Sequence, residues 1–536
     1  MINILYCDTE TTGLSPFKDK VTLFQYSWDK EDIVRMIRHP TDEQMADIFN
    51  QAERIVMHNS AFDFGMAHYI PKPEQIVDTA RLSRLVDYIH EEHTLDKVAL
   101  RTYGFDPYKP FDKKKMQRTD WSAKELTPEQ LRYAELDVKV LRPVLARLKQ
   151  GLSDPIYKFD SKSVVAGLTI QQHGLPVLHD KVTKEIHETE EKLADLLDKL
   201  PVNPNSPKQV CEALQVKSSA DKELAALEMK GHSLAKAIRE ARRAGKYLNF
   251  LNKLNANERY YGTLAPNAAS GRFTSSKENI QQIPRAQKRF IGSSDNVVIS
   301  ADYAQLELRC IATLARDRTM VGLFRDGEDL HGYTAAQLFG DDYTKDQRQI
   351  AKVFNFSLLY GAGARTVQQI LIAQAGVHMD EETVKQLKYK WLNAYKGIAA
   401  WQKEGAFRYE QSLPHTTPLG RPYMARSYTQ MLSLSNQGFG AEIARWALHY
   451  ILDHIPPEGK VVNFVHDSVL IECPNDPDIY KPIAKLVQVA FKKSWKNAPI
   501  KTYGVPMPVE VAAAHNWKDA DSLENCVYVL EDNDDE

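Results

Sequence analysis

The sequence predicts an α/β protein of several compact units, with a mixed α/β domain first and an α+β region after it. Its 536 residues suffice for about three or four units, each with its own core. Strand-like and helix-like patterns alternate through residues 1–148, as in a mixed α/β domain. Apolar runs at 297–299 and 461–465 then indicate strands, and helical patterns lie between them.

The composition is ordinary for a globular protein, with 43% hydrophobic and 26% charged residues. No apolar stretch approaches the ~20 residues of a membrane span, and no signal peptide begins the chain. We therefore expect a cytoplasmic protein that is neither secreted nor bound to a membrane. The five cysteines are scattered and form no CxxC pair, which indicates a reducing compartment and no zinc site.

The net charge of −2 argues against a nucleic-acid partner only until its distribution is considered. Residues 518–536 hold eight acids and one lysine, so the rest of the chain carries a net charge of about +5. Residues 208–259 hold eleven Lys or Arg against six acids. These residues could be a solvated helical pair or a unit that grips a nucleic-acid backbone.

A carboxylate stands at the end of the strand predicted at 297–299. The chain turns just after Asp302, and the apolar positions that follow indicate a helix packed on the strand. A carboxylate at a strand end can hold a hard cation, because a rigid element fixes its position. Taken alone, such an aspartate is more often a helix N-cap or a turn residue.

A second carboxylate lies at the tip of a predicted hairpin. The runs 461–465 and 469–471 flank His466, Asp467 and Ser468. If the hairpin shares a sheet with the earlier strand, Asp302 and Asp467 face each other. They could then hold two Mg²⁺ ions about 3.5–4 Å apart, the arrangement used for in-line phosphoryl displacement.

Between these carboxylates, a predicted helix carries an unusual face. Thr344 begins it with a capping box and Gly361 ends it. A spacing of four places on one face the side chains of Arg348, Lys352, Phe356 and Tyr360. Two cations followed by two aromatics suit neither a core nor a solvated face. They suit a nucleoside triphosphate, with the cations on the phosphates and the aromatics against sugar and base.

The N-terminal domain contains a separate set of acids. Asp8 and Glu10 share one face of a predicted strand, Asp63 follows, and Tyr133 precedes Asp137 by one helical turn. Scattered, solvated acids are the plain interpretation. Gathered in space, the four acids could hold two metal ions, while Tyr133 orients the attacking water.

These patterns resemble known motifs. DYAQLELR, RQIAKVFNFSLLYG and VHDSVLIE resemble motifs A, B and C of the family A DNA polymerases. The four acids and the tyrosine resemble the DEDDy 3′–5′ exonucleases, which include the proofreading domain of that family. The resemblance implies a ribonuclease-H-like α/β exonuclease domain and an α+β right-hand polymerase domain with palm, fingers and thumb.

The resemblance also divides the chain. We expect the exonuclease domain at 1–150, a linker at 151–163, a short thumb at 164–260, the palm at 261–320 and 431–518, the fingers at 321–430, and a disordered acidic tail at 519–536. Only seven residues precede Asp8, and we expect no 5′-nuclease domain before it. This compactness favours a phage-type replicative enzyme.

Roles for individual residues follow from the resemblance. It implies that Asp302 and Asp467 hold two Mg²⁺ ions, for which Mn²⁺ can substitute, and that Lys352 protonates the leaving pyrophosphate. The expected dNTP contacts are Gln305, Glu307, His331, Arg348, Lys352, Phe356 and Tyr360. The expected DNA contacts are Arg272, Gln282, Arg285, Gln437 and His466. The stretches 417–421 and 436–438 also fall where the family contacts template and primer.

One departure from the family matters: Ser468 stands where a glutamate is usual. We expect activity to survive with an altered metal dependence. Phe356, in place of tyrosine, predicts discrimination against dideoxynucleotides, while Glu307 and Tyr360 are expected to crowd a ribose 2′-hydroxyl.

Two other functional classes remain open: an exonuclease whose second half only binds DNA, and a non-catalytic replisome scaffold. The expected partners are primer–template DNA and dNTPs. A helicase–primase, a single-strand-binding protein or a processivity factor would join them during replication.

Overall fold

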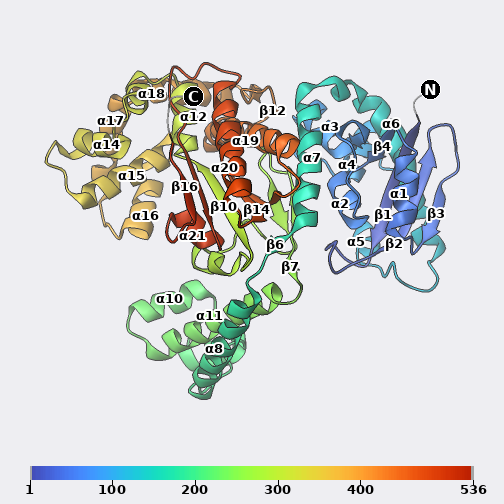
Figure 1. Ribbon diagram of the computed structural model, residues 1–536, viewed down its shortest axis with the longest axis horizontal. Coiled ribbons are helices and arrows are strands. Elements are labelled where there is room, and N and C mark those ends of the chain that lie inside the picture. Colours follow the sequence, from blue (N-terminus) through green and yellow to red (C-terminus); the bar gives the residue numbers. More distant parts are fainter. Residues whose placement is uncertain (1–2, 533–536) are drawn as a thin grey trace.

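The computed structural model describes residues 3–532, which form three bodies around one central helix (Figure 1). The N-terminal domain lies on one side, a sheet domain with a cluster of helices lies on the other, and a small helical unit projects below. Within the described residues, no helix is long and apolar enough to cross a membrane.

The N-terminal domain is a mixed five-stranded sheet with the strand order β3-β2-β1-β4-β5. Its central strand β1 pairs antiparallel with β2 and parallel with β4. The strands are β1 (Ile4–Thr11), β2 (Val21–Trp28), β3 (Arg35–Arg38), β4 (Arg54–Met57) and β5 (Ile76–Asp78). The helices are α1 (Asp42–Asn50), α2 (Ser60–Met66), α3 (Thr79–Val86), α4 (Leu95–Tyr103), α5 (Lys113–Met116) and α6 (Pro128–Leu148). This mixed α/β architecture confirms the predicted class of the first domain.

Residues 151–163, where we expected a linker, belong instead to regular structure. They continue from the 3-10 helix η2 (Lys149–Ser153) into helix α7 (Pro155–His173). Asp154 caps this helix by accepting a hydrogen bond from the backbone N–H of Ile156. Leu168 of α7 belongs to the core of the N-terminal domain, and Ile170 belongs to the core of the sheet domain. The linker prediction was wrong because α7 is buried between two domains, and its polar residues face partners across that interface.

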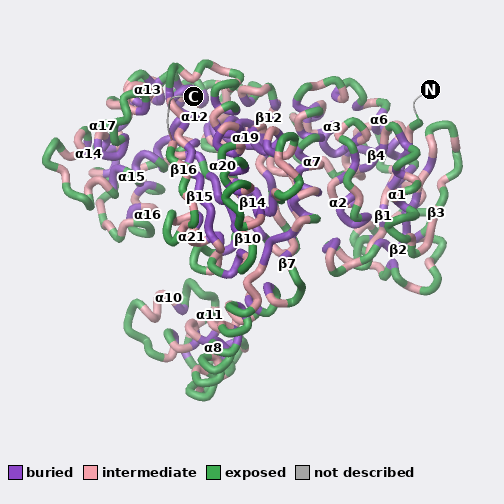
Figure 2. The backbone as a smooth tube through the Cα atoms, in the orientation of Figure 1, coloured by how far each residue is buried: buried purple, intermediate pink, exposed green. Residues whose placement is uncertain are grey.

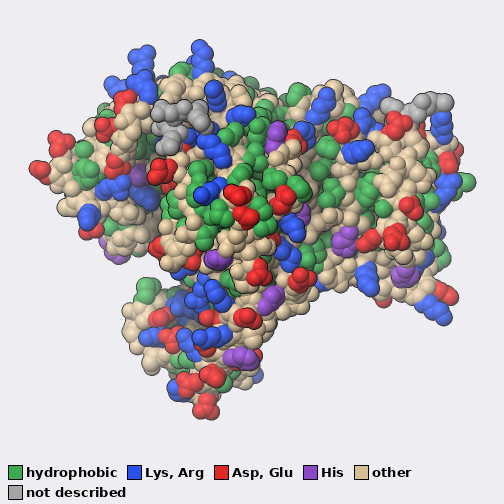
Figure 3. Space-filling view, in the orientation of Figure 1, with side chains coloured by type: hydrophobic (Ala, Val, Ile, Leu, Met, Phe, Trp, Pro, Cys, Tyr) green, Lys and Arg blue, Asp and Glu red, His purple; other side chains and the backbone are tan. Residues whose placement is uncertain are grey.

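The helical unit below α7 joins the rest of the chain through two short strands. Strands β6 (Leu175–Pro176) and β7 (Arg259–Tyr260) pair antiparallel at its base. Its helices are α8 (His179–Asp198), α9 (Pro207–Leu214), α10 (Asp221–Met229) and α11 (Ser233–Leu254). Figure 3 shows Lys and Arg side chains gathered on the part of this unit nearest the sheet domain, with acidic side chains at its far end.

The sheet domain contains an antiparallel five-stranded sheet with the order β13-β14-β10-β15-β16. The strands are β10 (Asn296–Tyr303), β13 (Lys460–Val465), β14 (Ser468–Pro474), β15 (Val509–Ala514) and β16 (Tyr528–Leu530). Helix α20 (Pro477–Lys496) packs on the sheet, α19 (Tyr428–His454) packs on α20, and α12 (Leu306–Leu314) packs on α19. Figure 2 shows that the central strands are buried along most of their length, so the sheet is a rigid support for residues at its strand ends.

The remaining helices form a cluster at the side of this sheet (Figure 1). They are α13 (Arg318–Arg325), α14 (Leu330–Phe339), α15 (Lys345–Leu359), α16 (Ala364–Ala375), α17 (Glu381–Ala394) and α18 (Lys396–Glu410). Three shorter elements complete the chain: the hairpin β8 (Thr263–Ala265) with β9 (Thr274–Ser276), the 3-10 helix η3 (Arg285–Phe290), and the hairpin β11 (His415–Thr416) with β12 (Pro422–Tyr423).

The acidic C-terminal segment is more ordered than we expected. Helix α21 (Trp517–Ser522) packs on β10, and β16 adds the last strand to the sheet. Asp521 accepts hydrogen bonds from the Ser300 hydroxyl (2.6 Å) and the Trp517 indole (2.9 Å), and it pairs with Lys288. The prediction of a disordered tail was therefore wrong for residues 519–532, because specific partners compensate part of the negative charge. Residues 533–536 lie outside the described chain.

Candidate functional sites: two carboxylate centres and a cationic helix face

The first centre gathers three of the four N-terminal acids predicted to hold metal. Asp8 and Glu10 lie on one face of β1, and Asp137 reaches them from α6. One oxygen of each of these three carboxylates lies within 4.8 Å of the others. Asp63 comes from α2 and accepts a hydrogen bond from the Thr9 hydroxyl (2.7 Å), so β1 also fixes the orientation of this fourth acid.

Neighbouring polar groups orient these carboxylates. The amide of Gln25 on β2 donates to Asp8 (2.8 Å), and the hydroxyl of Tyr108 donates to Asp137 (2.6 Å). Sequence reasoning missed both residues, since no local pattern distinguishes them. Tyr133 lies one turn before Asp137 on α6, with its ring centroid 5.8 Å from that of Tyr108.

Burial and mutual repulsion disfavour ionisation of the carboxyl groups in this centre. Burial, together with the neighbouring acids, raises the pKa values of Asp8, Glu10 and Asp63 well above their ordinary range. Burial also raises the pKa of Asp137 to about 7, although the hydrogen bond from Tyr108 opposes this shift. Closely spaced hard oxygen donors that resist ionisation fit divalent cations, which relieve the repulsion.

The second centre brings together the two carboxylates predicted from the strand patterns. Asp302 lies near the end of β10, and Asp467 lies in the turn between β13 and β14. Ala301 pairs with Val469 across β10 and β14, which places Asp302 beside the start of β14. His466 adopts a left-handed conformation (φ 56°) that closes the turn tightly.

The electrostatics of the second centre resemble those of the first. The Asp302 side chain reaches solvent at its strand end, yet the surrounding protein raises its pKa to about 7, and Asp467 adds to the rise. Burial raises the pKa of Asp467 to about 6, with Glu307 contributing while Arg272 opposes. These carboxylates also fit divalent cations, because a cation would relieve the repulsion that raises their pKa values.

Helix α15 presents the predicted cationic and aromatic face to solvent. Thr344 and Gln347 form its capping box. Lys352 and Phe356 are exposed between buried neighbours, while Arg348 and, at the C-cap, Tyr360 are partly exposed. This pattern follows the spacing of four.

Residues on α14 occupy one end of this face. Asp329 accepts two hydrogen bonds from Arg348, at 2.7 and 2.9 Å, so the guanidinium already has a carboxylate partner. His331 accepts a hydrogen bond on Nδ1 from Asn355 (2.9 Å), which leaves Nε2 as the protonated nitrogen. Burial and Arg348 lower the pKa of His331 to about 4, so the ring is neutral.

A closed set of hydrogen bonds joins α15 to the second centre. Glu307, at the start of α12, accepts from both Arg272 and the hydroxyl of Tyr360. Asn436 of α19 donates to the backbone oxygen of Glu307 and to the Tyr360 hydroxyl. Gln305, the remaining residue predicted at this site, is exposed with a φ of 59° just before α12.

Some of the residues predicted near DNA are accessible to solvent, and others are bonded to partners within the protein. Gln282, Arg285 and His466 are exposed, and Gln437 is partly exposed. The loop before Gln282 packs against β13, since Gln281 donates to the backbone oxygen of Phe464 (2.9 Å).

Two further residues in stretches expected to contact template and primer are buried instead. Asn436 is fully buried. Arg421 donates two hydrogen bonds, of 2.6 and 2.9 Å, to Asp160 of α7. Both side chains are therefore held by partners within the protein.

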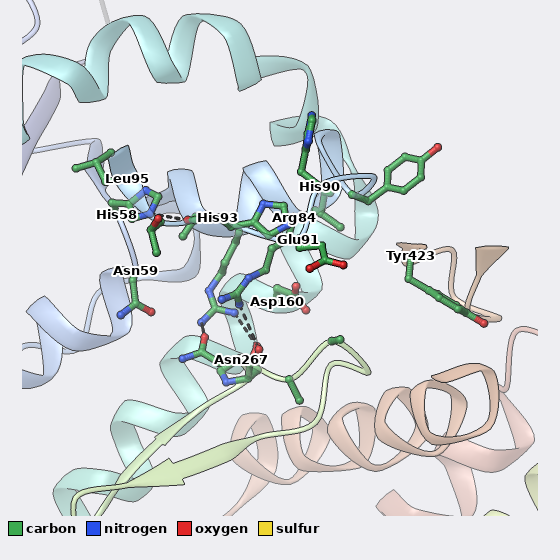
Figure 4. Close-up of a pocket in the computed structure, with 18 of the residues that line it drawn as sticks. His58, Asn59, Arg84, His90, Glu91, His93, Leu95, Asp160, Asn267 and Tyr423 are labelled. Atoms are coloured by element: carbon green, nitrogen blue, oxygen red, sulfur yellow. Dashed lines mark hydrogen bonds between the residues drawn. The ribbon is translucent and has the colours of Figure 1, made fainter. Parts of the chain in front are cut away.

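A cavity of about 730 Å³ opens between the N-terminal domain and the sheet domain (Figure 4). Asp8, Tyr133 and Asp137 line it from one side, and Tyr423 and Gln430 line it from the other. Cationic side chains stand along its wall: Arg81, Arg84, Arg421 and Lys113. Figure 4 shows Arg84 beside Asn267, whose backbone oxygen accepts its hydrogen bond (3.3 Å).

Comparisons with known proteins show which family the chain belongs to. The model of DNA polymerase family A matches residues 172–519, more than half of the chain, and that of a 3′–5′ exonuclease matches residues 2–153. DNA polymerase I of Aquifex aeolicus is 28% identical, with 96% of this chain and 95% of the relative aligned. The DNA polymerase of Mycobacterium phage D29 is 29% identical, with 78% of each chain aligned.

A solved structure shares the fold. The POL domain of Pol1 from M. smegmatis, in complex with DNA primer-template and dNTP, superposes with a TM-score of 0.70. The alignment covers 96% of both chains at 20% identity. The exonuclease and right-hand fold classes predicted from the sequence are thus confirmed.

Proposed function

The chain belongs to DNA polymerase family A and is a DNA-directed DNA polymerase with a 3′–5′ exonuclease domain, and we propose that its two carboxylate centres divide these activities. Asp302 and Asp467 serve nucleotide addition, and Asp8, Glu10, Asp63 and Asp137 serve removal of the primer 3′ end. One observation carries this proposal: the two carboxylate centres lie on two separate sheets.

In the polymerase centre, Asp302 and Asp467 would hold two Mg²⁺ ions, or Mn²⁺ in their place. When bound, these ions lower the pKa of the primer 3′-hydroxyl and neutralise charge that develops on the transferred phosphorus. Lys352 reaches solvent on α15, where it gives a proton to the leaving pyrophosphate.

The face of α15 binds the incoming nucleotide. Arg348 and Lys352 contact the phosphates, and Phe356 lies against the nucleoside. Because Arg348 is paired with Asp329, the phosphates must either share the Arg348 guanidinium with that carboxylate or displace the carboxylate from it. Neutral His331 donates through Nε2–H and Gln305 lines the site. Glu307 and Tyr360, called here the sugar gate, exclude a ribose 2′-hydroxyl.

In the exonuclease centre, the four acids hold a second pair of divalent ions, which supply an activated water when bound. Tyr133 orients that water, while the Tyr108 hydroxyl keeps Asp137 aimed at the centre. The cavity in Figure 4 admits the separated 3′ end, and Arg84, which is partly exposed on its wall, neutralises a phosphate.

Further parts of the assignment concern DNA and its setting. The basic helical unit from α8 to α11 is the thumb, although residues 164–173 of the expected range 164–260 belong to α7. Residues 261–320 and 431–518 form the palm, and 321–430 the fingers. Arg272, Gln282, Arg285, Gln437 and His466 contact primer–template DNA. Replication of a phage genome in the host cytoplasm, beside a helicase–primase, is the setting that we propose.

Extension of a labelled primer on a DNA template with Mg²⁺ tests the two-centre assignment. Asp302→Ala should abolish extension and keep dNTP-free shortening of the primer, whereas Asp8→Ala should do the reverse. Wild-type protein run in parallel controls for both reactions. Loss of both activities in either single variant would contradict a division between two centres.

A further inference from the structure

Asn436 is a fully buried amide in the middle of α19, at the back of the sugar gate. Its Nδ2 group donates two hydrogen bonds, to the backbone oxygen of Glu307 (3.0 Å) and to the hydroxyl of Tyr360 (3.2 Å). A single side chain from a third element therefore holds both members of the gate.

These bonds determine the direction of the Tyr360 hydroxyl proton. A phenol hydroxyl has one proton to donate, and in this structure it donates to the carboxylate of Glu307. Asn436 approaches the same oxygen as a donor, so it favours a hydroxyl proton that points away from it, toward Glu307. Arg272 binds the other carboxylate oxygen of Glu307, which completes the set.

Stability alone does not account for an amide at this position. The Oδ1 atom of Asn436 is buried and accepts no hydrogen bond from any described residue. A buried acceptor without a partner costs about 1–3 kcal/mol, a cost that an apolar side chain of similar shape avoids. The two donor bonds hold the amide in the orientation that leaves Oδ1 unpaired.

We propose that Asn436 is a positioning residue that enforces selection of deoxyribonucleotides by holding Tyr360 and Glu307 together. This inference rests on the proposed role of the sugar gate. With Asn436 present, the only proton of the Tyr360 hydroxyl is committed to Glu307, and the ring has a fixed place. Without it, the ring is free to shift and its hydroxyl to turn toward a ribose 2′-hydroxyl, which would then be tolerated.

The test measures kcat and KM for each dNTP and its ribonucleotide in single-nucleotide extension. Asn436→Leu removes the amide but keeps the branched skeleton of the side chain, and Asn436→Asp keeps the shape while replacing the donor by an acceptor. Each variant should lower the ratio of kcat/KM for deoxy- over ribonucleotide about fivefold, the effect of one hydrogen bond. The change should appear mainly in the KM for the ribonucleotide.

Three controls separate positioning from general damage. Ser435→Ala removes a hydrogen bond to Tyr423 from the same helix and should leave discrimination unchanged. The thermal midpoint of Asn436→Leu should not fall, because the unpaired acceptor is removed with the amide. In a Tyr360→Phe background, Asn436→Leu should change discrimination less than about twofold, because its partner hydroxyl is absent.

The outcomes distinguish this inference from the gate itself. If Tyr360→Phe or Glu307→Ala lowers discrimination but both Asn436 variants keep the wild-type ratio, the role of Asn436 is wrong and the gate stands. If none of these variants changes the ratio, the sugar gate is wrong and this inference is lost with it. A fall in discrimination in both Asn436 variants, but not in Ser435→Ala, supports the positioning role.

Discussion

Replacing Asp160 with asparagine should destabilise the protein by about 3–5 kcal/mol, because it leaves two arginines buried without a counter-charge. Asp160 lies in α7 with 3% of its surface exposed. It accepts two hydrogen bonds from Arg421 (2.6 and 2.9 Å) and one from Arg445 (2.6 Å). Arg445 is fully buried and Arg421 is 8% exposed.

The magnitude follows from these contacts. Each hydrogen bond to a charged group contributes about 1.5–3 kcal/mol, and the asparagine retains one acceptor of the two carboxylate oxygens. Burial alone would raise the pKa of Asp160, but Arg421 and Arg445 hold it below its ordinary value, so the carboxylate is charged at neutral pH. The variant therefore loses both the charge and part of the hydrogen bonding.

Urea unfolding at pH 7, followed by tryptophan fluorescence, measures this loss. Asp453→Asn is the matched control. Asp453 of α19 pairs at 3.7 Å with Lys162, which lies on α7 near Asp160, and both side chains are more than half exposed. An exposed pair contributes about 0–1 kcal/mol, so the control should unfold almost like the wild type. A loss below about 1 kcal/mol in Asp160→Asn would refute the reasoning.

Three further predictions concern single side chains. Ser468→Glu places a third carboxylate beside Asp302 and should lower the Mg²⁺ concentration for half-maximal extension; an unchanged titration would show that this position does not influence metal binding. Phe356→Tyr should raise dideoxynucleotide incorporation about fivefold or more in a terminator competition assay, since the added hydroxyl can replace a lost polar contact; equal incorporation by both proteins would contradict this. Burial raises the pKa of Glu442 to about 7, above its unfolded value, so its contribution to stability is lost as the pH rises through that pKa. Between pH 4.5 and pH 8, the free energy of unfolding of Glu442→Gln in urea should therefore rise by about 2–4 kcal/mol relative to that of the wild type. A difference between the two proteins that does not change with pH would be inconsistent with the raised pKa.

Local patterns were sufficient where one element decides the structure. The capping box at Thr344 and the spacing of four on α15 predicted both the start of the helix and its solvent-facing side chains. Local patterns were insufficient at 151–163, where the polar residues suggested a linker. The structure buries this segment because Asp160 meets partners 261 and 285 residues further along the chain.

The sequence by itself determined the element types and the identity of the carboxylates, because periodicity and capping act over a few residues. Only the tertiary structure decided which polar groups meet. Tyr108 reaches Asp137 across 29 residues, and Asn436 reaches Tyr360 across 76. Such partners are set by how separately formed helices and sheets pack together, and burial then makes each hydrogen bond between them costly to lose.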